Sequence, residues 1–132
     1  MLAAQFGEIA EGNLKALVAN KTPESQMLDF KRDVPSRDAK GRHDFCADVC
    51  AFANGSGGDL VYGIDEDSEG RAAAIVPSSV NPDDEQLRLL DVVLNGLEPR
   101  VTGVQVRAVS VAGGNAFVVR VPRSWAGPHR VK

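Results

Sequence analysis

Carboxylates and a lysine stand where two neighbouring strands would bring them to one place. Glu24, Asp29 and Lys31 lie in one short segment, and Asp65 closes the run Leu-Val-Tyr-Gly-Ile-Asp. Clustered carboxylates hold divalent metal ions or handle phosphates, whereas a plain core needs none of them. The alternative is that Asp29 and Lys31 form a solvated strand face and that Asp65 only forms a turn.

Two predicted strands would position these groups. Apolar side chains alternate with Asp29 and Lys31 over residues 26–32, which is typical of a half-buried strand. A second strand is predicted over residues 59–65, with Asp65 at its end. If the two strands are neighbours, the three charged side chains converge.

The remaining elements follow from apolar spacing and turn signals. The clearest helix start is at Asn81, which can cap a helix whose first turn holds a proline and three acids. An apolar stripe follows on that helix: Leu87, Leu90, Leu94 and Leu97. We expect helices over about 6–20, 43–53 and 81–97, a polar loop over 33–41, and a hairpin of strands 101–111 and 116–121. This order predicts an α+β fold, with a mixed, mostly antiparallel sheet of about four or more strands and helices packed on it.

The composition indicates a single globular domain, residues 1–132, because 43% of the residues are hydrophobic and 25% are charged. No apolar run approaches the roughly 18 residues of a membrane span, so we expect no membrane partner. Cys46 and Cys50 lie four residues apart in a helical pattern, which favours reduced core thiols and a cytoplasmic location. His43 shares their helix face, but no fourth zinc ligand stands at a matching spacing.

Charge is unevenly distributed along the chain. Residues 46–99 carry eleven acids against two arginines, whereas residues 100–132 carry six bases and no acid. A basic C-terminal strip beside an acidic middle can follow a phosphate backbone. The alternative is that the two parts pair with each other on the surface.

The basic strip holds the candidate contacts to nucleic acid. Arg120 points away from the apolar face of its predicted strand, so we expect its side chain to be exposed. Arg123, His129 and Arg130 follow, and such side chains hold phosphates. Trp125 either stacks on a base or packs into the core, which is the commoner role of a lone tryptophan.

A glycine turn joins the second helix to the second strand. Asn54 and the glycines that follow, including Gly57 and Gly58, tolerate the backbone conformations that a helix exit requires. The turn meets the negative end of the helix, whereas phosphate cradles lie at helix N-termini, and the chain contains no Gly-Lys-Ser/Thr motif. We therefore do not expect ATP hydrolysis, although backbone amides of the turn could contact a phosphate of nucleic acid.

Four motifs together resemble the Schlafen AlbA-like domain family. They are Glu-Ser…Asp-Phe-Lys from residue 24, Phe-Ala-Asn-Gly-Ser-Gly-Gly from residue 52, Leu-Val-Tyr-Gly-Ile-Asp from residue 60, and Val-Arg-Val-Pro-Arg-Ser…Pro-His-Arg-Val from residue 119. The resemblance spans about residues 10–132, and the glycine turn with its Gly-Ile-Asp strand is the most specific part. Bacterial members usually stand at the N-terminus of longer proteins assigned as transcriptional regulators. The chain could thus be followed by a further C-terminal domain.

The resemblance implies nucleic-acid binding, to DNA or RNA, with no cofactor required, and we favour a DNA-binding module of a transcriptional regulator. Mammalian relatives include ribonucleases with a carboxylate triad. Glu24 and Asp29 match its first two members, with Asp in place of the usual Glu at the second, and Asp65 or its rival Asp67 would be the third. The implied alternative is an endoribonuclease in which these acids bind Mg²⁺ or Mn²⁺ and Lys31 steadies the phosphate. In a straight strand Glu24 would fall on the face opposite to Asp29 and Lys31, so its side chain would have to reach in from the preceding loop.

A dimerising scaffold is a third alternative, because the predicted hairpin can leave an edge strand free to join a second copy. The functional predictions share one expected geometry, in which an acidic pocket is bordered by a rim of exposed arginines.

Overall fold

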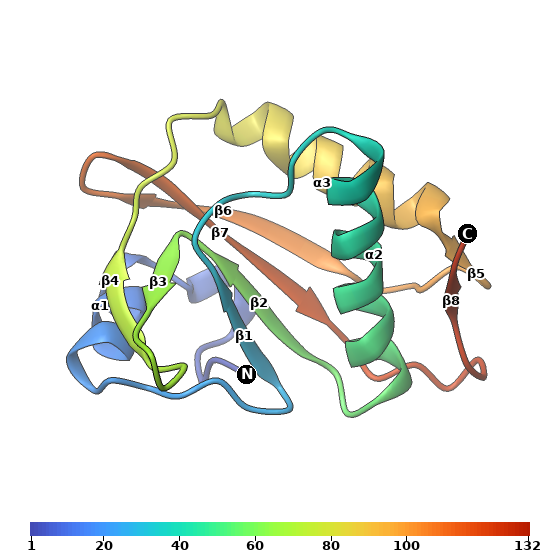
Figure 1. Ribbon diagram of the computed structural model, residues 1–132, viewed down its shortest axis with the longest axis horizontal. Coiled ribbons are helices and arrows are strands. Elements are labelled where there is room, and N and C mark those ends of the chain that lie inside the picture. Colours follow the sequence, from blue (N-terminus) through green and yellow to red (C-terminus); the bar gives the residue numbers. More distant parts are fainter.

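In the computed structural model, which describes residues 1–132, a mixed four-stranded sheet forms the centre of the protein (Figure 1). Its strands, in the spatial order β1-β2-β7-β6, are β1 (Leu28–Lys31), β2 (Gly58–Tyr62), β7 (Gly114–Val121) and β6 (Gln105–Val111). β1 is parallel to β2, and the other two pairings are antiparallel. The predicted α+β class and mostly antiparallel sheet are confirmed. β6 lies at an edge of the sheet, and a dimer through that edge stays a prediction.

Two small sheets stand beside the central one. Their strands are β3 (Ile64–Glu66) with β4 (Ala72–Ile75), and β5 (Leu97–Glu98) with β8 (Arg130–Val131). The prediction of a single strand over residues 59–65 is wrong. The chain bends at Gly63 (φ 103°) and continues as β3, which belongs to another sheet. A Cβ at Gly63 would lie 3.1 Å from the Cβ of Ala116, so the bend needs a glycine.

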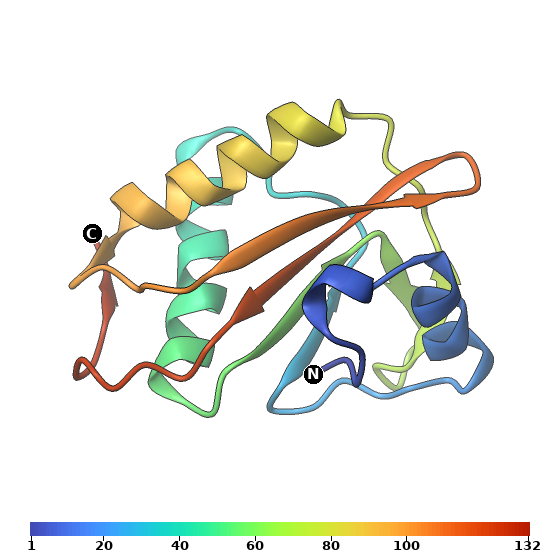
Figure 2. The ribbon, with the colours of Figure 1, turned by 180° about the vertical axis from the view of Figure 1, so that it is seen from behind.

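Helices cover both faces of the central sheet (Figures 1 and 2). The helical elements are a 3₁₀ turn (Phe6–Glu8), α1 (Glu11–Ala19), α2 (Ala39–Asn54) and α3 (Pro82–Gly96). Side chains of β7 alternate between two cores. Phe117, Val119 and Val121 pack with α2 and α3, whereas Ala116 and Val118 pack with α1 and the N-terminal segment. The sheet is therefore the middle layer of three, with no solvated face at its centre.

The loop predicted over residues 33–41 is shorter than expected, because α2 already begins at Ala39. The Asp38 side chain caps the helix by accepting a hydrogen bond from the backbone N–H of Gly41 at 2.8 Å. The predicted start of α3 is confirmed, since Asn81 accepts from the backbone N–H of Asp84 at 3.0 Å.

The predicted apolar stripe of α3 does not face the core. Leu87, Leu90 and Leu94 are exposed, and only Leu97, which belongs to β5, is buried. The helix instead buries the face that carries Glu85, Leu89 and Val93. Glu85 tolerates burial because Arg88 donates to both of its carboxylate oxygens. Two faces of this helix are apolar in sequence, and the one that contacts α2 and β6 packs inward, with the Glu85–Arg88 pair satisfying the one charge buried on it.

A buried ion pair joins the two central strands to the N-terminus. Asp59 on β2 is fully buried and lies opposite Arg120 on β7, whose Nε and Nη2 donate to the carboxylate at 2.9 and 3.0 Å. Asp59 also accepts from the backbone N–H of Leu2, and Arg120 donates to the carbonyl oxygens of Leu2 and Ala4. The Arg120 guanidinium lies over the Phe6 ring at 5.6 Å. The pair thus ties the N-terminal segment across the sheet.

We expect Arg120→Ala to lower the free energy of unfolding by about 3–5 kcal/mol, because it leaves the buried Asp59 carboxylate uncompensated. Urea denaturation of both proteins measures the change. The exposed Arg123→Ala serves as the control and should change the stability by at most about 0.5 kcal/mol. A loss below about 1 kcal/mol in Arg120→Ala would contradict this role.

Candidate functional site

A groove lined by acids runs beside β1, between α2 on one side and β3 on the other. Five charged side chains of its lining are the subject here, and we call them the carboxylate groove: Glu24, Asp29, Lys31, Asp48 and Asp65. Arg32, Asp33, Asp44 and Glu66 also line it. The structure thus brings the four residues predicted to converge to the walls of one hollow. Asp48 was not predicted. It is one acid on a helix with several polar positions, a pattern that normally indicates solvated surface.

Local structure explains how each side chain reaches the groove. Leu28 and Phe30 fill the core beneath α1, so the alternation of β1 turns Asp29 and Lys31 toward α2. Glu24 reaches in from the preceding loop as expected, and its Oε1 accepts a hydrogen bond from the backbone N–H of Phe30 at 3.1 Å.

Lys31 lies between two carboxylates of the groove. Its Nζ is 3.5 Å from Oδ2 of Asp29 and 3.6 Å from Oδ2 of Asp48. Burial lowers the pKa of the Lys31 ammonium, but the charges of Asp48 and Asp29 outweigh it, so the pKa is raised. Lys31 is therefore charged at neutral pH.

Asp29 is the carboxyl whose protonation changes near physiological pH. Burial, and next its hydrogen bond with Glu24, raise the pKa of Asp29 to about 6, although Lys31 opposes the shift. The Asp29 carboxyl therefore holds its proton in mildly acidic solution, where an ordinary aspartate is ionised.

The three predicted metal ligands do not form an ion site as they are placed in the structure. No three His, Cys, Asp or Glu side chains lie where they could hold one ion together. Asp65 stands on β3, in a separate sheet, because the chain bends at Gly63. The rival Asp67 accepts from Nε of Arg71 at 2.9 Å and closes the turn before β4. The residues present therefore do not fit the Mg²⁺ or Mn²⁺ site that the resemblance implies.

Three basic side chains of the C-terminal strip are held by contacts within the fold. The expectation that Arg120 is exposed is wrong, because the sheet face to which it points is covered by the N-terminal segment. Arg107 is also tied to that segment, since its Nε donates to the carbonyl oxygen of Ile9 at 2.9 Å. His129 is buried, and its ring nitrogens lie 2.6 Å from the Pro99 carbonyl oxygen and 2.6 Å from Oγ of Ser124. Neither Arg120 nor His129 is free to hold a phosphate.

The residues of the glycine turn likewise already form hydrogen bonds and packing contacts within the protein. The Asn54 side chain bonds the backbone of His129 twice, at 2.9 and 2.8 Å. The amide of Gly57 donates to Phe52, and a Cβ at Gly58 would come 2.5 Å from Cε1 of the Phe52 ring. The turn thus packs the end of α2 against the C-terminal segment, and the Gly57 amide that was expected to contact a phosphate is already bonded.

Cys46 and Cys50 are buried free thiols in the core beneath α2, as predicted. The Cys50 thiol lies 2.9 Å from the carbonyl oxygen of His129.

Arg123 and Trp125 are exposed side chains of the strip that stack on each other. The Trp125 side chain is 81% exposed, so the commoner role of a core anchor is wrong for this residue. The Arg123 guanidinium lies over its ring at 4.1 Å from the centroid. Both border a shallow hollow that also contains Asn54, Ser124 and Pro128, and we call this set the Trp125 platform. Arg130 is exposed as well, and its Nη2 donates to Oε2 of Glu98 at 2.9 Å.

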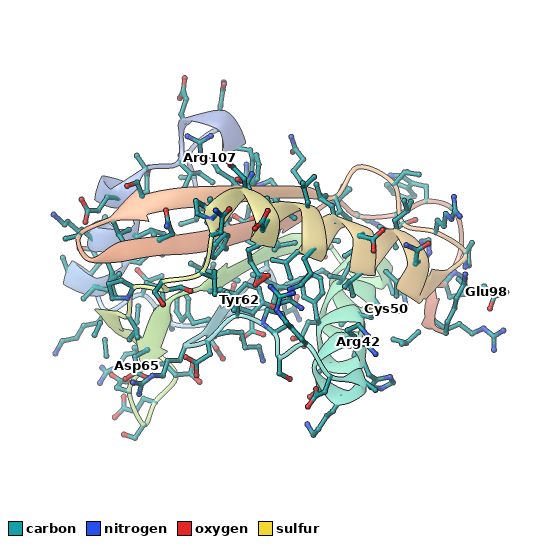
Figure 3. All side chains as sticks on the ribbon, turned by 90° about the horizontal axis from the view of Figure 1, so that it is seen from above. Arg42, Cys50, Tyr62, Asp65, Glu98 and Arg107 are labelled. Atoms are coloured by element: carbon teal, nitrogen blue, oxygen red, sulfur yellow. The ribbon has the colours of Figure 1, made fainter.

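The groove and the basic strip are two separate surfaces. Asp65 and Glu98, the partner of Arg130, lie at opposite ends of the molecule (Figure 3). The expectation of one acidic pocket bordered by the arginines of the C-terminal strip is therefore wrong, because Arg120 is held by Asp59 and Arg130 lies beside Glu98. The exposed arginine that does line the hollow of Asp65 is Arg32, which follows β1.

Comparisons with known proteins agree with the motifs. A family model described as Schlafen, AlbA_2 matches residues 24–132. No curated protein is significantly similar to the chain. The solution NMR structure of the N-terminal domain of a RecG-related protein from Nitrosomonas europaea, provisionally assigned as an ATP-dependent DNA helicase, is 28% identical with a TM-score of 0.60; the similarity covers 83% of this chain and 70% of that one.

A second solved structure shares the fold. The crystal structure of the DIP2311 protein from Corynebacterium diphtheriae is 21% identical with a TM-score of 0.56 and covers 89% of this chain. The match spans 25% of that longer protein. None of the helices of the present chain has the length and apolar character that crossing a membrane requires.

The raised pKa of Asp29 predicts a pH-dependent stability. The native state binds the Asp29 proton more tightly than the unfolded state does. The stabilisation from this proton is therefore complete below pH 3.8, the ordinary pKa of an aspartate, and is lost as the pH rises through about 6. Asp29→Asn should therefore be more stable than the wild type at pH 8 by about 1–2 kcal/mol, a figure reduced for partial exposure, and nearly equal to it at pH 4. Urea midpoints at both pH values measure the difference, with the exposed Asp33→Asn as the control. A constant difference between wild type and Asp29→Asn would contradict the raised pKa.

Proposed function

Because the chain belongs to the Schlafen AlbA_2 family, we propose that it binds single-stranded nucleic acid, DNA or RNA, at the Trp125 platform. The observation that carries this proposal is the exposed pair of Arg123 and Trp125, in which a guanidinium lies 4.1 Å from the centroid of a ring that is 81% exposed. Proteins hold single strands by stacking bases on such rings while cations bind the backbone.

The position of Trp125 supports a role at the surface rather than in the fold. A ring so exposed contributes little burial of apolar area, which is how aromatic residues normally stabilise a domain. Stacking with Arg123 covers part of the ring and places a positive charge beside it. A base seated near the ring would therefore have its phosphate close to a cation.

Other exposed bases extend the positive surface. Arg100, Arg123, Arg130 and Lys132 are exposed at the C-terminal end of the chain. The carboxylate groove, in contrast, repels a polyanion, which favours binding at the basic end. Stacking and phosphate contacts carry little sequence information, so we expect weak sequence preference.

The relatives agree with this class of partner. The N-terminal domain of the RecG-related protein from Nitrosomonas europaea belongs to a protein assigned as a DNA helicase, which supports association with nucleic acid. More specifically, we propose that the chain is a DNA-binding module of a transcriptional regulator.

We expect Trp125→Ala to weaken binding of a labelled 20-nucleotide single strand about 5- to 100-fold, because one stacked base contributes about 1–3 kcal/mol. Arg123→Ala should weaken binding of all sequences alike and reduce the slope of log affinity against log salt by about one. Fluorescence anisotropy at several salt concentrations measures both effects. Lys15→Ala, an exposed base on α1, is the matched control and should behave as the wild type. Salt-independent binding, or equal affinity of all four proteins, would rule out the platform.

Incubation with RNA separates binding from hydrolysis. The carboxylates of the groove are not placed to hold an ion, so we expect labelled structured RNA to stay intact with Mn²⁺ present. Gel electrophoresis over several hours tests this. Cleavage that Asp29→Asn abolishes would show that the groove is a nuclease site and that binding is only part of the function.

A further inference from the structure

The exposed face of α3 is an apolar surface that the fold does not use. Leu87, Leu90 and Leu94 have exposed fractions of 68%, 38% and 48%. Their spacing of three and four residues places them within about 60° of one another on a helix with 100° per residue. Seen from above, α3 lies on the outside of the molecule and no other element passes over it (Figure 3). We call these three side chains the leucine face.

Carboxylates border the leucine face and form no ion pair within the chain, although Oδ1 of Asp91 accepts a hydrogen bond from Nδ2 of Asn95 at 3.0 Å. Asp84 and Asp91, seven residues apart, fall on the same flank, and Asp83 stands at the N-terminal end of the face. All three are exposed and form no ion pair, whereas Glu85 is paired with Arg88. Acids in the first turn of a helix interact favourably with its dipole, which accounts for Asp83 and Asp84 but not for Asp91 in the middle of the helix. The flank is thus negative along the length of the face.

We propose that the leucine face binds an amphipathic helix of another protein, one with an apolar seam and with Lys or Arg along one edge. The spacing of the three leucines is that of a coiled-coil seam, with two successive contacts three and four residues apart. Basic side chains at seven-residue intervals on the partner would meet Asp84 and Asp91. The face spans about 10 Å at a rise of 1.5 Å per residue, so it fits about two turns of a partner and gives weak, reversible binding.

Charge argues against a second copy of this chain as the occupant. α3 carries one cation, Arg88, and it is held by Glu85 and the Pro35 carbonyl oxygen. In an antiparallel pair of α3 helices centred on Leu90, Asp91 of each copy would lie near Asp91 of the other. The like charges would face each other, and α3 supplies no free base to separate them.

A pair of designed peptides tests the proposal. One fluorescein-labelled 21-residue peptide carries Leu at the seam positions and Lys along both flanks, and its match carries Glu in place of every Lys. We expect the Lys peptide to bind the full chain at least about tenfold more tightly than the Glu peptide in anisotropy titrations at low salt. Leu90→Gln should weaken binding of the Lys peptide about fivefold or more, and Asp91→Lys should reduce the ratio between the two peptides. Glu8→Lys makes the same charge change outside the face and should leave the ratio unchanged.

Both substitutions should leave the protein folded, because Leu90 and Asp91 contribute little to the core. Thermal melts should place the melting temperatures of both variants within a few degrees of the wild type. Equal binding of the two peptides, or binding that Leu90→Gln leaves unchanged, would overturn the proposal. So would a dimer in sedimentation equilibrium that Leu90→Gln dissociates, because the face would then be covered by a second copy.

Discussion

The pairing of Asp59 with Arg120 is the interaction on which the rest of the structure depends. It joins the two central strands at opposite positions of one register, and the same two side chains hold the backbone of Leu2 and Ala4. A fully buried carboxylate is stable only with such a partner. By covering the second face of the sheet, the N-terminal segment turns a two-layer arrangement into a three-layer one. That change determines which charged side chains remain at the surface.

The surface that remains is divided by charge. Acids gather beside β1, where burial and mutual repulsion make the site unfavourable for the fold, as the raised pKa of Asp29 shows. Such strain is common where a protein keeps groups for a function rather than for stability. Four exposed bases belong to the C-terminal part of the chain, Arg100, Arg123, Arg130 and Lys132, and Arg123 stacks there on Trp125.

Local signals predicted the elements well and the exposure of their faces less well. Alternation in β1 and the cap at Asn81 were read correctly because both depend on neighbours in sequence. Parity also placed Arg120 on the correct side of β7. Its burial could not be predicted, because the cover comes from residues more than 110 positions away. Similarly, α3 has two apolar faces, and only contact with α2 and β6 selects the one with Leu89 and Val93.

The sequence by itself determined the fold class, the family and the convergence of Glu24, Asp29, Lys31 and Asp65, because strand period, turn glycines and caps are local properties. Only the tertiary structure decided what those residues can do. In the folded chain Asp48 also lines the groove and Asp65 lies in another sheet. Arg120 and His129 are held by contacts within the protein. The physical reason is that a side chain's charge is written in the sequence, whereas its solvation and its distance from other charges arise only when remote segments pack together.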